Sequence, residues 1–157
     1  MTSAIDEDTA AYVIENRTYF DDLGQVAAQL AGLLVLAASG AKTATPHHPM
    51  LDSADQLYRE ALDGLRHARV TPRASTHHRH VTQAAAEIGT ALSSARRHVG
   101  RLGRGQAIET ILAPLRAGYS HLQCAADALP GFEPIAFAQG CCGHHLAAPL
   151  DEARVSP

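Results

Sequence analysis

The sequence predicts an all-α protein, an antiparallel up-down-up-down four-helix bundle with a docked C-terminal extension. Three observations lead to this prediction. Ala and Leu dominate the 157 residues and only 4% are aromatic, a composition that favours close-packed helices over a β-sandwich. Apolar residues recur at spacings of three, four or seven in four long segments. No segment alternates with period two for long, and no βαβ rhythm is present in the sequence.

The first predicted helix begins close to the N-terminus and ends before Gly40. Ser3 together with Asp6, or Thr9 alone, are the candidate caps of its first turn. Gly24 is a point at which the helix could break, which would change the packing but not the fold class. The predicted inward stripe consists of Tyr12, Tyr19, Leu23, Val26, Leu30, Leu34 and Ala37.

The other three helices follow after short connections. The second runs from about Pro49 to Val70, and its stripe is Leu51, Ala54, Tyr58, Ala61, Leu65 and Ala68. The third runs from about Ser75 to Leu102, with the stripe Val81, Ala84, Ile88, Leu92, Ala95, Val99 and Leu102. The fourth spans about Gln106 to Leu129, where Pro130-Gly131 ends it, and its stripe is Ile108, Ile111, Leu115, Tyr119, Leu122, Ala126 and Leu129.

The chain is therefore expected to divide into a bundle, residues 1–130, and an extension, residues 131–157. The extension opens with Phe132, Ile135 and Phe137, and exposing these side chains to water would be costly. We expect them to pack on the bundle. The final residues, from about 147 onward, are polar and bounded by proline, which is typical of a loose end.

Charge and cysteine content restrict the function classes. The formal net charge is −3, so no strong field recruits nucleic acid, which makes nucleic acid an unlikely partner. The N-terminus lacks a basic region followed by an apolar run, and the longest apolar stretch, Val26 to Ala38, is too short to span a bilayer. Three cysteines, an odd number, argue against a disulfide framework. The expectation is a cytoplasmic protein without a membrane segment.

The most pointed chemical feature lies in the extension. Two thiols and two imidazoles fall within five residues, Cys141, Cys142, Gly143, His144 and His145. Thiolate and imidazole are ligands for zinc, copper, iron or nickel. Adjacent side chains diverge, so one Cys and one His are the realistic contribution to a single ion. The remaining ligands would have to come from the bundle.

Topology points to one end of the bundle as their source. His121 and Cys124 are three residues apart on the fourth helix and so share a face. In an up-down-up-down bundle the same end holds the second connection, with His77, His78 and His80 beside it as reserve ligands or as partners that hydrogen-bond to the ligands. Most of the 10 histidines and all three cysteines then gather at one pole. Metal binding would order the extension and give another protein a changed surface to recognise.

Two alternatives stay open. The cysteines could simply pack and the histidines could be solvated, which leaves a metal-free interaction bundle, most simply a homodimer. An enzyme is the third possibility, since Arg116 to His121 and Arg73 to His78 fit the Arg-x(4–6)-His spacing of some RNA-cleaving helical bundles, and His98 loosely resembles a phosphotransfer histidine. Arg and His are both so abundant here that chance explains such pairs. The sequence therefore favours a non-enzymatic accessory or sensing protein.

Overall fold

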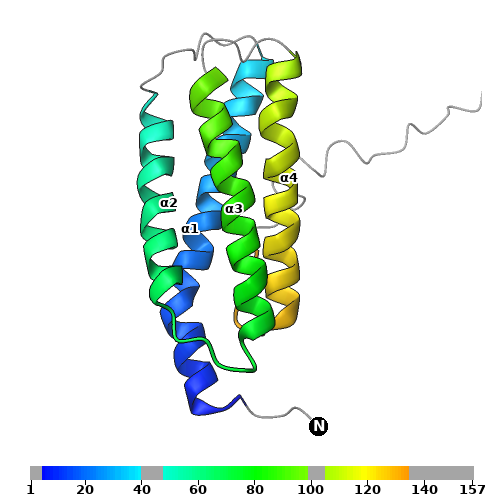
Figure 1. The fold of residues 1–157 in the computed structure, drawn as a ribbon. Helices are drawn as coiled ribbons and strands as arrows, with labels where there is room; N and C mark the ends of the chain where they lie inside the picture. The colour runs from blue at the N-terminus through cyan, green and yellow to red at the C-terminus, as the bar shows by residue number, and fades with distance from the viewer. Residues whose placement is uncertain (1–4, 40–47, 99–104, 135–157) are drawn as a thin grey trace, which may run out of the picture.

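The computed structural model describes residues 5–39, 48–98 and 105–134, and these residues form four helices and no strand. The helices are α1 (Glu7–Ala38), α2 (Pro49–His67), α3 (Ser75–His98) and α4 (Gly105–Ala128). Figure 1 shows them lying side by side as a bundle. The prediction of an all-α fold with four helices is confirmed.

The start of α1 is fixed by Asp6, which was expected only as the partner of Ser3 and is itself the N-cap. Its carboxylate accepts hydrogen bonds from the Thr9 backbone N–H and the Thr9 hydroxyl, both at 2.8 Å. These bonds hold the pKa of Asp6 below its ordinary value, with the backbone bond as the larger cause. The helix then continues without interruption for 32 residues, so the break considered at Gly24 does not occur.

The connection between α2 and α3 is a turn built on threonine and proline. α2 ends at His67, three residues before the predicted Val70, and Ala68 is already extended with ψ 134°. The Ala74 N–H donates to the Thr71 carbonyl at 3.0 Å and to the Thr71 hydroxyl at 3.2 Å. α2 has therefore ended before this turn, in which Pro72 disfavours a helical conformation of Thr71, and α3 begins directly after it at Ser75.

The core follows the predicted apolar stripes closely. Each helix contributes stripe residues that are almost fully buried, among them Leu23, Leu51, Ile88, Ile111 and Leu122. Leu129 and Phe132, which follow α4, are buried with them. The burial of these apolar side chains is the main contribution to the stability of the bundle.

Two tyrosines at the edge of the core lie against glycines on the neighbouring helix. The Tyr19 ring of α1 occupies the space beside Gly64 of α2, where a methyl group would collide with it. Tyr58 of α2 lies in the same way against Gly89 of α3, and its hydroxyl donates to the Ala85 carbonyl at 3.0 Å. At these two points glycine leaves room for a tyrosine ring of the neighbouring helix, so the two helices can pack closely around it.

Candidate functional site

Three of the predicted site residues, His77, His78 and His80, lie in the first two turns of α3. Successive residues of a helix are rotated by about 100°, so the three side chains leave α3 in different directions. His77 enters the core, while His78 and His80 are half-buried. The sequence placed these residues in one group, whereas the helix distributes them over separate surroundings.

His77 is a core residue. Only 1% of its surface is exposed, and its ring stacks on Phe132 with the ring centroids 3.9 Å apart. Phe20 lies on the same cluster, 5.2 Å from Phe132 between centroids. Burial lowers the pKa of His77 to about 4, helped by the nearby His78 and His80, so the imidazole is neutral at neutral pH.

A single phenol joins His77 to its neighbour. The Tyr12 hydroxyl lies 2.9 Å from Nδ1 of His77 and 3.4 Å from Nδ1 of His78. Because a hydroxyl both donates and accepts, it is able to donate to one imidazole and accept from the other. Burial raises the pKa of Tyr12 and lowers that of His78, so all three groups are neutral at neutral pH. Nε2 of His77 is buried and has no hydrogen-bond partner among the described residues.

His80 faces α4. Its ring lies 5.8 Å from the ring of His121, centroid to centroid, with the two planes tilted by 31°. Nδ1 of His80 is buried and lacks a hydrogen-bond partner within the part of the chain that the structure describes. The sequence thus correctly placed His80 and His121 at a common end of the bundle, and the structure brings their rings together.

The other predicted ligands are not part of this pair. Cys124 is a free, exposed thiol one turn further along α4. Cys141, Cys142, His144 and His145 lie outside the described residues. In residues 5–39, 48–98 and 105–134, no group of three or more His, Cys, Asp or Glu side chains is arranged to hold a metal ion. The described ligands alone therefore do not make a complete metal site.

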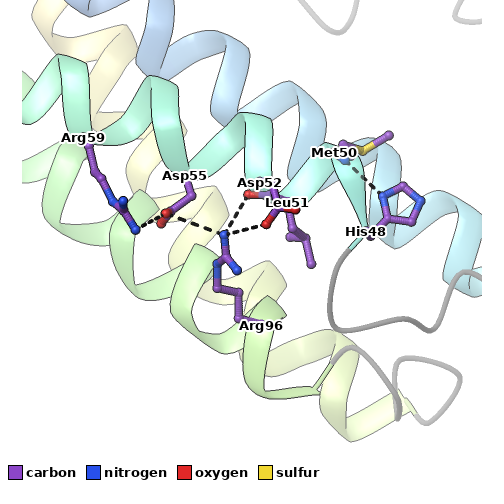
Figure 2. A network of polar contacts seen from close by, with 7 residues as sticks. All are labelled: His48, Met50, Leu51, Asp52, Asp55, Arg59 and Arg96. Carbon is purple, nitrogen blue, oxygen red and sulfur yellow. Dashed lines mark hydrogen bonds and ion pairs between the residues drawn. The ribbon is translucent and has the colours of Figure 1, made fainter.

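A polar network joins the start of α2 to the end of α3 (Figure 2). Arg96 donates to the Leu51 carbonyl at 3.2 Å and forms ion pairs with Asp52 at 3.3 Å and Asp55 at 3.6 Å. Arg59 forms a second ion pair with Asp55. Arg96, in the last turn of α3, therefore joins α3 to α2.

Sequence reasoning missed two features of this region. His48 was not given a role, yet its Nδ1 accepts from the Met50 N–H at 3.2 Å and caps α2. The burial of His77 was also missed. A usable signal existed, because extending the stripe of α3 backward from Val81 by four and seven residues gives His77 and Ala74, which are both buried.

Comparison of the chain with protein-family models, with curated proteins and with solved structures finds no match. Among the described helices, α1 is long and apolar enough to cross a membrane. Half of its most apolar stretch is buried inside the bundle, and the core helix of a water-soluble protein has the same properties. The cytoplasmic location therefore stays a prediction.

Proposed function

We propose that this protein is a non-enzymatic accessory or sensing protein that binds a transition metal at the end of the bundle where His80 and His121 meet. The observation that carries the proposal is this pair of rings, 5.8 Å apart, with Nδ1 of His80 buried and unpartnered among the described residues. A buried imidazole nitrogen without a hydrogen bond is costly, and a bound ion would remove that cost.

The spacing of the pair suits a shared ion. An imidazole nitrogen binds zinc at about 2 Å, so two rings on one ion have centroids about 5 to 6.5 Å apart. The observed 5.8 Å lies within this range. Since His80 and His121 come from two adjacent helices, the bundle itself holds their backbones at the required separation.

The extension is suited to supply the remaining ligands. Phe132 packs against His77, so the chain leaves the bundle beside the histidine-rich end. Cys141 follows nine positions later, and an extended chain of that length reaches at most about 30 Å. One Cys and one His from Cys141, Cys142, His144 and His145 would complete a four-ligand site, with Cys124 as a further thiol near the same helix end.

We further propose that the bundle is antiparallel, with the extension docked on it. Support comes from paired positions on neighbouring helices whose numbers rise on one helix as they fall on the next: Tyr19–Gly64 and Gln29–Ser53, Asp52–Arg96 and Tyr58–Ala85, His80–His121 and Ile88–Gly118. Docking is supported by Phe132, which is buried on Phe20 and His77, while Ile135 and Phe137 lie outside the described residues.

A metal-free homodimer is the second candidate. It is favoured by the outer face of α1, where Ile14 and Val35 are 76% and 68% exposed. Gly32 on the same helix has open space beside it, which would allow a second helix to approach closely. This candidate requires no ion at His80 and His121.

Elemental analysis of protein purified without a His-tag separates the two candidates. We expect about one equivalent of a transition metal, a lower melting temperature after chelation, and loss of the metal in a His80→Gln, His121→Gln variant. His67→Gln is the matched control, because His67 is exposed and engaged with Asp63 of its own helix. Less than about 0.2 equivalents, with no effect of chelator on melting, would contradict metal binding. Sedimentation of that metal-free sample as a dimer would favour the second candidate.

The extension is tested separately. A Cys141→Ser, Cys142→Ser variant is expected to bind the metal more weakly, because thiolates are strong ligands for these ions. If this variant keeps its metal with unchanged affinity while the His80→Gln, His121→Gln variant loses it, the remaining ligands come from elsewhere, and the role proposed for the extension is wrong.

A further inference from the structure

A groove lies between α2 and α3. Its volume is about 510 Å³, and four residues from each helix line it: Tyr58, Leu62, Leu65, Arg66, His78, Thr82, Ala85 and Ala86. Figure 1 shows these two helices side by side. This volume falls within the range of about 300 to 1,000 Å³ that is usual for small-molecule sites.

The floor and walls of the groove are apolar. Leu65 and Ala85 are buried, and Leu62 is partly buried against the core. The Thr82 hydroxyl donates to the His78 carbonyl of its own helix at 2.9 Å, so its proton is already engaged. A ligand lying here would therefore contact mainly carbon atoms, and binding would remove apolar surface from water.

The two ends of the groove differ in chemistry. At one end the Tyr58 hydroxyl is bonded to the Ala85 carbonyl and draws α2 onto α3. Beyond this contact, towards the start of α2, the helices are joined by the Arg96 network of Figure 2. Arg66 lies two turns further along α2; its guanidinium forms no ion pair within the described part of the chain, and its charge is near enough to act on the Tyr58 phenol, where it opposes the rise in pKa caused by burial. The eight lining residues include no carboxylate.

We propose that this groove binds a medium-chain monocarboxylate, with its alkyl chain between α2 and α3 and its carboxylate on Arg66. An apolar channel with one unpaired guanidinium and no acid is complementary to a ligand with one anionic head and one apolar tail. Tyr58 and Arg66 are eight residues apart on α2, which corresponds to about 12 Å along the helix axis. Decanoate matches this length when extended.

The proposal is independent of metal binding, and the test is done on the full chain in the presence of a chelator. Calorimetric titration with decanoate is compared with decanol, which lacks the charge, and with butyrate, which lacks the long chain. We expect decanoate to bind at least about tenfold more tightly than either. NMR shifts caused by decanoate should be concentrated on the Ala85 and Ala86 methyls and the Tyr58 ring.

Two variants assign the binding to the groove. Arg66→Gln should weaken decanoate binding about tenfold and leave decanol unchanged, because an exposed charge is lost without disturbing the core. Ala86→Phe should weaken both ligands, because it fills the groove from an exposed lining position. Arg79→Gln is the matched control, an exposed arginine on α3 outside the groove. Equal affinity for decanoate and decanol, no binding of decanoate, or equal loss in Arg66→Gln and Arg79→Gln would overturn the proposal.

Discussion

The buried histidine of α3 predicts that the protein loses stability in mild acid. His77 has a pKa of about 4 in the folded protein and an ordinary value of 6.5 when the chain is unfolded. Between these values the unfolded state binds a proton that the folded state does not. The free energy of unfolding is therefore greatest above pH 6.5 and falls as the pH is lowered towards 4.

The size of the effect follows from the two pKa values. One pKa unit corresponds to 1.36 kcal/mol, so the contribution of His77 falls by about 2 kcal/mol between neutral pH and pH 5, and by about 3 kcal/mol at pH 4. The pKa of His78 is also lowered by burial, which adds a loss of the same sign. The carboxylate of Asp6, with its lowered pKa, adds to the loss only in stronger acid.

Urea unfolding followed by circular dichroism, at a series of pH values from neutral to about 5, measures this loss. The matched comparison is His77→Gln, which retains hydrogen-bonding groups towards Tyr12 but does not titrate. The variant should be less stable than the original protein at neutral pH. Its free energy of unfolding should then fall by about 2 kcal/mol less than that of the original protein between neutral pH and pH 5. NMR titration of the His77 ring in the folded protein gives its pKa directly. Parallel pH profiles for the two proteins, or a His77 pKa near 6.5, would refute the argument.

Two further predictions concern packing. Gly64→Ala should destabilise the bundle by about 1 to 3 kcal/mol, because a methyl group there collides with the Tyr19 ring. Gly32→Ala should stabilise it by about 0.5 to 1 kcal/mol, because the space beside Gly32 is open and alanine favours a helix. The melting temperatures of both variants check this. Equal shifts in melting temperature would show that helix propensity alone sets the effect of the two substitutions. Phe132→Ala should cost about 3 kcal/mol and raise the pKa of His77 by opening its pocket to water. A stable variant with an unchanged His77 titration would mean that Phe132 does not seal the core.

The fold was predictable because the four helices have strong apolar periodicity and clear ends. Proline and glycine mark the connections, and most of the described stripe residues are buried, although Tyr19, Tyr58 and Ile108 are only partly so. Where α2 ends was less predictable. Its periodic pattern continues through Ala68, but Ala68 is already extended, and the Thr71-Pro72 turn that leads into α3 follows three residues later. The apolar spacing does not mark this end.

The candidate site was predictable only in part. To predict that His80 and His121 lie close together, it was enough to know which helix ends meet. Separating His77 from His80 required the rotation of each side chain about α3, which a grouping by sequence distance ignores. The apolar stripe extended backward from Val81 passes through His77, but a histidine on such a stripe looks like a polar interruption, and its aromatic neighbours from α1 and the segment after α4 become visible only in the structure.

The Tyr12 phenol has a consequence for how the chain matures on the ribosome. Its partner His77 lies 65 residues further along the sequence, and the Thr9 hydroxyl likewise waits for Thr71, 62 residues away. At a synthesis rate of roughly 5 to 20 residues per second, α1 precedes these partners by about 3 to 13 s. During that interval α1 has α2 to pack against, but its contacts with α3 and α4 are still missing. Thr9 and Tyr12 therefore gain these polar partners only after residues 71–77 have been synthesised.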